Sequence, residues 1–140
     1  MLIGTSPLNA PGWRQASPSP RAEPTLLSHA VLDDLRDLIG TESFGAFLAQ
    51  VHADLCAAAE DIARADAAGD FAGLRRHSHA MIGVAGAIGA TEVEEVARAL
   101  NAAARATDIE GTRSRVAVLR RISEALCDEI AWQREGQRPL

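Results

Sequence analysis

The sequence predicts an all-α protein, an antiparallel up-down four-helix bundle with a short extra N-terminal helix. The stretch between Thr25 and Arg138 contains no proline, which suits long uninterrupted helices. Apolar residues recur there at spacings of three and four, without an alternating strand pattern. The breaks between helical segments are short, so successive helices should be antiparallel neighbours. A chain of 140 residues suits one domain, since domains usually take roughly 100–200 residues.

The first two helices are indicated by residues that start and stop helices. A short helix should follow Ser28, a favourable N-cap, and end at Gly40. The second should run from near Thr41 to about Ala68. Its apolar positions form an amphipathic stripe, made of Phe44, Phe47, Leu48, Val51, Leu55, Ala58 and Ile62.

Three more helices complete the predicted bundle. Gly69-Asp70 breaks the chain and caps a third helix over about 71–88, which Gly89 closes. The apolar face of the fourth should contain Val93, Val96, Ala97 and Leu100, and that of the fifth Val116, Leu119, Ile122, Leu126 and Ile130.

Local signals mark where the last two helices begin. Thr91 followed by Glu94 is a capping-box pattern and predicts the start of the fourth helix. The fifth should start near Asp108 or Thr112.

Five of the six prolines lie in the first 24 residues, with Ser17 and Ser19 among them. This composition predicts a flexible Pro/Ser-rich arm or linker over residues 1–25. The bundle itself should span 26–135, with a frayed tail over 136–140.

Charge and hydropathy exclude several classes of function. The formal net charge is −5 without a basic patch, which argues against nucleic acid as a partner because phosphate contacts dominate that affinity. No apolar run approaches the roughly 18 residues that span a bilayer, and the N-terminus lacks the features of a signal peptide. We therefore expect a cytoplasmic protein that does not insert into membranes. All 14 basic residues are arginine, a bias that points to a GC-rich bacterial genome.

Cys56 and Cys127 are far apart in the sequence and belong to no C-x-x-C pair. Each falls within a helical pattern, so we expect two reduced, buried thiols in the cytoplasm.

The third helix separates its residues into two faces on a helical wheel of about 100° per residue. One face is the predicted core stripe, made of Leu74, His77, Met81, Val84, Ala85 and Ile88. The other includes Ala72, Arg75, Arg76, His79, Ile82, Gly83 and Gly86. His79 should therefore face water, whereas His77 should lie at the edge of the core and bond to a neighbour.

Gly83 and Gly86 lie about one and two turns beyond His79. Each glycine costs a helix about 1 kcal/mol relative to alanine, which favours a site where a partner approaches the backbone closely. Close packing between helices of the bundle is the alternative explanation.

The segment His79-x-Met81-x-Gly83-x-Ala85-x-x-Ile88-Gly89-Ala90 resembles the signature of histidine-containing phosphotransfer (Hpt) domains, His-x-Leu-Lys-Gly-Ser-Ala-x-x-Leu-Gly-Ala. The resemblance covers roughly residues 28–132 in helix order, and the specific motif about 71–105. It implies that His79 accepts a phosphoryl group in a phosphorelay of two-component signalling. The chain would be a phosphotransfer protein with a transient phosphohistidine rather than a turnover enzyme.

The resemblance also implies the partners: a response-regulator receiver domain and a hybrid or sensor histidine kinase, bound by a monomer. A neutral imidazole is a nucleophile that needs no base to remove a proton before it attacks an acyl phosphate. The protein therefore needs no cofactor of its own, and the Mg²⁺ of the reaction should belong to the partner receiver domain.

Several residues near His79 depart from the family pattern or add to it. Ile82 stands where the family commonly has lysine. Arg105 matches a position that is basic in some family members, and Asn101 matches a position that is often Glu or Gln. These two residues are therefore predicted to support the phosphoryl group and the imidazole ring of His79. Partner docking is predicted for Arg75, Arg76, Ile82, Gly83 and Gly86. The two arginines should lean toward the N-terminus, away from His79.

The sequence is also compatible with two other functions. One is an adaptor or inhibitor that docks a receiver or kinase non-covalently and has lost phosphotransfer. Another is an ordinary bundle with a chance motif match. No metal site is predicted, because His77 and His79 point about 160° apart on a helix and no di-metal motif is present.

Overall fold

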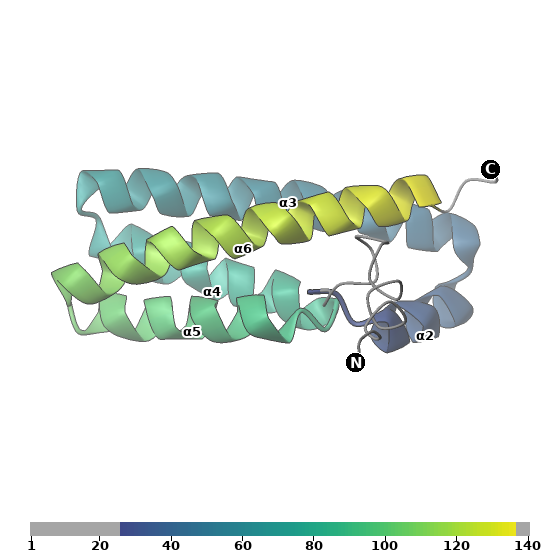
Figure 1. Ribbon diagram of the computed structural model, residues 1–140, viewed down its shortest axis with the longest axis horizontal. Coiled ribbons are helices and arrows are strands. Elements are labelled where there is room, and N and C mark those ends of the chain that lie inside the picture. The colour runs from purple at the N-terminus through teal and green to yellow at the C-terminus, as the bar shows by residue number, and fades with distance from the viewer. Residues whose placement is uncertain (1–25, 137–140) are drawn as a thin grey trace, which may run out of the picture.

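The computed structural model describes residues 26–136, which form five helices (Figure 1). They are α2 (His29–Ile39), α3 (Thr41–Ala68), α4 (Phe71–Ala87), α5 (Thr91–Arg105) and α6 (Ile109–Gly136). Each long helix packs against the next, and α6 packs back against α3, so α3, α4, α5 and α6 close a ring. The short α2 lies at one end of the bundle and contacts α3. The predicted all-α bundle with an extra N-terminal helix is confirmed.

The predicted starts and stops of the first helices are correct. Ser28 Oγ accepts a hydrogen bond from Val31 N at 3.2 Å and caps α2. Gly40 and Gly69 end α2 and α3 with φ values of 89° and 67°, a region that L side chains rarely adopt. Asp70 Oδ1 then accepts from Gly73 N at 2.9 Å and caps α4.

The predicted capping box of α5 is wrong. The N-cap is Ala90, and helical bonding already starts from its carbonyl, which accepts from Glu94 N at 3.0 Å. Thr91 is therefore the first residue inside the helix, where its hydroxyl cannot act as the cap. Glu94 pairs instead with Arg98 at 2.7 Å.

For α6, the earlier of the two predicted starts is the correct one. Asp108 Oδ1 accepts from Gly111 N at 2.9 Å, the bond expected of a capping aspartate. Thr112 is already inside the helix, where its hydroxyl donates to Ile109 O at 2.9 Å.

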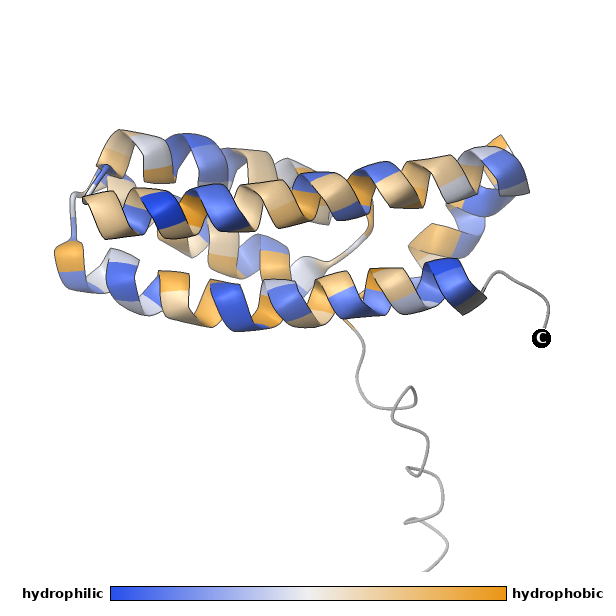
Figure 2. Cartoon of the chain, turned by 90° about the horizontal axis from the view of Figure 1, so that it is seen from above, coloured by the Kyte–Doolittle hydropathy of each residue, from blue (hydrophilic) through white to orange (hydrophobic). Residues whose placement is uncertain are grey.

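One apolar core fills the bundle. Figure 2 shows hydrophobic and hydrophilic residues alternating along each long helix, as amphipathic helices require. Burial of each large apolar side chain stabilises the fold by roughly 1.5–3 kcal/mol. The largest fully buried side chains are Phe44, Leu32, Leu48, Leu55, Ile62, Leu74, Met81, Ile88, Leu100, Leu119, Leu126 and Ile130.

A carboxylate of α6 holds the segment that leads into α2. Glu129 Oε2 accepts from Leu26 N at 2.9 Å, and Glu129 Oε1 accepts from Leu27 N at 3.1 Å. These bonds satisfy two backbone donors that precede the first helix, and they keep Leu27 in the core, where it is 5% exposed.

The predicted arm over residues 1–25 lies outside the described residues, as do 137–140 of the predicted tail. Gly136 is the last residue of α6. Within residues 26–136, every helix is too short or too polar to cross a bilayer.

Replacing Glu129 with alanine should lower the free energy of unfolding by about 1.5–3 kcal/mol, the usual range for hydrogen bonds to a charged group. Urea denaturation followed by circular dichroism measures this loss. Glu135→Ala is the matched control, because Glu135 is an exposed carboxylate near the end of the same helix, and it should change stability by less than about 0.5 kcal/mol. Equal stability of the two variants would contradict the anchoring role of Glu129.

Candidate functional site

The helix α4 presents His79 to solvent because its opposite face is in the core. Leu74, Met81 and Ala85 on that face are each at most 1% exposed, whereas His79 is exposed. The predicted assignment of faces is confirmed for these residues.

Two further residues of the core stripe predicted for this helix lie at the edge of the core. His77 and Val84 are only half-buried. His77 Nδ1 lies 3.6 Å from Asp61 Oδ2 of α3, an ion-pair separation that is longer than a hydrogen bond. His77 is thus an edge residue beside a carboxylate.

Ser78, beside His79 in the sequence, is a site residue that the sequence analysis missed. Its side chain is completely buried, and Ser78 Oγ donates to Arg75 O at 3.1 Å. Its spacing was the available signal, since it lies four residues after Leu74 and three before Met81 on the buried face.

Asn101 links α5 to α4 beneath His79. Its Nδ2 donates to Arg75 O and to Ser78 Oγ, each at 3.0 Å, and its Oδ1 accepts from Arg105 Nε at 2.8 Å. Both amide protons of Asn101 are therefore used in the contact between the helices, and the same amide orients the Arg105 guanidinium.

A shallow hollow between α4 and α5 brings five of the predicted residues together. It is lined by Ala72, Arg75, Arg76, His79, Asn101 and Arg105. Arg75 and Arg76, which were expected to lean away from His79, line the same hollow as this residue. Three exposed arginines thus line the same hollow as the histidine, in a chain of net charge −5, and their charge makes this hollow locally attractive to an anion.

The backbone on the C-terminal side of His79 is open at one of the two glycines. A Cβ atom added to Gly83 would meet nothing within 4 Å, whereas one added to Gly86 would lie 3.6 Å from Glu94 Oε1. Close helix packing therefore does not explain Gly83. Ile82, on the same turn, is half-buried and packs against the core.

Gly83 also borders a second hollow, between α3 and α4, together with Phe47, Gln50 and Val84. The predicted docking residues thus lie on both sides of α4. Arg75 and Arg76 line the hollow on the α5 side, where Gly86 lies near Glu94, and Gly83 borders the hollow on the α3 side.

Cys56 and Cys127 are half-buried and come together across α3 and α6, with their Sγ atoms 3.3 Å apart. Burial, together with a hydrogen bond and charge interaction from Cys56 and the carboxylates of Asp128 and Glu124, raises the pKa of the Cys127 thiol to about 12. This thiol is therefore protonated at neutral pH. This proximity was not predicted from the sequence.

The chain has recognisable relatives in sequence and in fold. The model of the Hpt domain family matches residues 32–130, a range that contains His79. The crystal structure of histidine-containing phosphotransfer protein B (HptB) from Pseudomonas aeruginosa PAO1 has the same fold, with a TM-score of 0.74 and 20% sequence identity. This similarity covers 80% of the present chain and 96% of HptB. A comparison with curated proteins finds no match.

The family match extends over the greater part of the described bundle. Hpt domains are phosphotransfer modules of two-component phosphorelays, and in general they interact with receiver domains and kinases. From the motif, the bundle and the family match together, the chain belongs to the Hpt domain family.

Proposed function

We propose that His79 is the phosphoryl acceptor of this Hpt domain. In this proposal it takes the group from a receiver-domain aspartate, or from a hybrid kinase, and passes it to a response regulator. The observation that carries the proposal is the exposed imidazole in a hollow lined by Arg75, Arg76 and Arg105. An exposed nucleophile beside several cations suits an anionic electrophile.

The proposed step is a displacement at phosphorus. The lone pair of the unprotonated ring nitrogen of His79 forms an N–P bond while the O–P bond to the donor aspartate breaks. The aspartate leaves as a carboxylate, and the other ring nitrogen keeps its proton. The second transfer reverses these changes with a new aspartate. Mg²⁺ would come with the receiver domain and stabilise charge on the transferring group.

Under this proposal the bundle provides exposure, orientation and positive charge rather than acid–base chemistry. Arg105 is the best placed cation, because its guanidinium is held by Asn101 Oδ1 at 2.8 Å at the edge of the hollow that contains His79. A preorganised donor of this kind loses little entropy when it binds a phosphoryl oxygen. Asn101 would support the site by holding Arg105 in place.

One observation favours the second candidate, a docking adaptor or inhibitor without phosphotransfer. Ile82 occupies the turn where the family pattern has lysine, and its side chain is half-buried against the core, so this turn supplies no cation for a phosphate. Both candidates use the same surface, and they differ in whether a phosphoryl group becomes attached to His79.

Transfer from a phosphorylated receiver domain tests the proposal directly. We expect wild-type protein and His77→Gln to acquire acid-labile, base-stable phosphate, and His79→Gln to acquire none. Radiolabel transfer or phosphate-affinity electrophoresis measures this, with circular dichroism to check folding. Equal labelling of His77→Gln and His79→Gln would show that His79 is not the phosphoryl acceptor. A complex that forms without any transfer would establish the adaptor instead.

Arg105→Gln should slow transfer about tenfold, the effect expected when a charge-assisted hydrogen bond worth about 1.5 kcal/mol is lost. The matched control is Arg98→Gln on the same helix, because Arg98 is exposed and pairs with Glu94 at 2.7 Å. Rates from rapid-quench experiments should be unchanged for this control. If both variants transfer at the wild-type rate, the cation near the phosphate is not Arg105.

Gly83→Arg should block docking of the receiver domain while leaving the fold intact, because the Cβ position is open. Gly45→Arg is the matched control. Its Cβ position is equally open, but by helical spacing Gly45 lies on the side of α3 that carries His52, seven residues on. Isothermal titration should give weakened binding for Gly83→Arg alone. Unfolding of Gly83→Arg, or equal binding by both variants, would contradict the proposed docking surface.

A further inference from the structure

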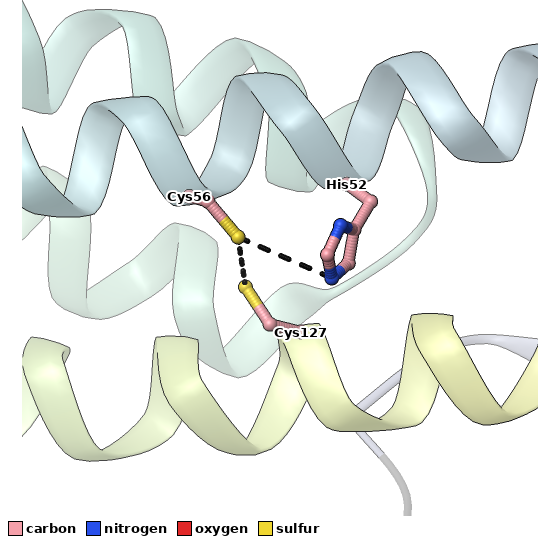
Figure 3. A group of neighbouring side chains, drawn as sticks. All are labelled: His52, Cys56 and Cys127. Carbon is pink, nitrogen blue, oxygen red and sulfur yellow. Dashed lines mark hydrogen bonds between the residues drawn. The ribbon is translucent and has the colours of Figure 1, made fainter.

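A second group of reactive side chains lies between α3 and α6. His52 and Cys56 are one turn apart on α3, and Cys127 faces them from α6 (Figure 3). Cys56 Sγ lies 3.3 Å from Cys127 Sγ and 4.0 Å from His52 Nε2. All three donor atoms are within 4.8 Å of one another, and the imidazole points toward the two sulfur atoms.

These separations are close to those of ligands around one metal ion. Zinc bonds of about 2.3 Å to sulfur and about 2.0–2.1 Å to nitrogen, at tetrahedral angles, place two sulfur atoms roughly 3.8 Å apart and sulfur and nitrogen roughly 3.6 Å apart. The S···S distance of 3.3 Å and the S···N distance of 4.0 Å each differ from these values by about half an ångström. Small rotations of half-buried side chains cover these two differences, and the third separation, between the His52 ring and Cys127 Sγ, lies within 4.8 Å.

The surroundings of the cluster also suit a cation. A hollow beside the two cysteines is lined by Glu60, Glu124 and Asp128 as well as by Arg120. The carboxylates outnumber the arginine there, and the hollow leaves room for a fourth ligand, either water or one of these carboxylates. A disulfide, by contrast, has an S–S bond of about 2.05 Å and gives no function to the converging imidazole.

We propose that His52, Cys56 and Cys127 bind one Zn²⁺ ion between α3 and α6. Binding would displace the protons of both thiols, so two thiolates and a neutral imidazole would hold the ion without any redox change. The ion would tie the first long helix of the bundle to the last.

This site is independent of the proposed phosphotransfer. Because α3, α4, α5 and α6 contact one another in ring order, the α3–α6 side is opposite the α4–α5 side that holds His79. Success or failure of either proposal therefore leaves the other unaffected.

Cobalt titration of the full chain, reduced with a phosphine and freed of metal, tests the site. We expect one equivalent of Co²⁺ to produce thiolate-to-cobalt charge-transfer absorption with tetrahedral d–d bands, and Zn²⁺ to displace it. Cys56→Ser and Cys127→Ser should each weaken the charge-transfer band. Even an outer-shell partner contributes about 10–100-fold to metal affinity, so His52→Ala should lower affinity by at least about tenfold.

His77→Ala is the control, since His77 is a half-buried histidine beside Asp61 outside the cluster, and it should bind cobalt as the wild type does. Zn²⁺ should also raise the melting temperature of the unmutated chain, a readout that does not depend on whether the variants fold. Absence of the bands, or bands that survive both serine variants, would overturn the proposal. So would a reduced chain that binds no metal but gains a Cys56–Cys127 disulfide, detected by mass, on oxidation.

Discussion

The hydrogen-bonded link from Asn101 to Ser78 and Arg75 is the polar contact that positions α5 beside the helix carrying His79. The buried side chains of these two helices are otherwise mostly apolar, several of them alanine, and apolar contacts are non-directional. The buried Ser78 hydroxyl donates to Arg75 O within α4, and the Asn101 amide adds directional bonds across the helices, to Ser78 Oγ and Arg75 O, that favour one register of α5 on α4. With Ser78 held inward, the next residue is turned about 100° around the helix toward solvent.

Most of the helices and their limits could be predicted because their signals are local. Gly40 and Gly69 stop helices through their own backbone conformation, and Asp70 caps α4 through a bond to a residue three positions away. The signal at Thr91 was equally local but misleading. The chain turns at Gly89, with φ of 68°, and helical bonding starts from Ala90 O, so the threonine enters the helix one position too late to cap it.

The features that escaped prediction are contacts between helices. A helical wheel states which side of a helix a residue occupies, but not which residue of another helix it meets. Cys56 and Cys127 are 71 residues apart, and nothing in their local sequence pairs them. The approach of His52 to the two sulfur atoms likewise depends on how α3 and α6 pack. For Ser78 the spacing on α4 indicates the buried face, but the bond that it accepts from Asn101 of α5 is again a contact between helices.

The electrostatics of the His79 hollow follow from the same packing. The family pattern has a lysine on α4 at the position of Ile82, and in this chain that side chain packs on the core instead. Positive charge near the histidine comes from Arg75, Arg76 and Arg105, and Arg105 belongs to the neighbouring helix. Asn101 both bonds α5 to α4 and accepts a hydrogen bond from Arg105 Nε, so the contact that joins these two helices also determines where this cation lies. The place of this α5 cation relative to the exposed His79 imidazole is therefore set by the α4–α5 contact.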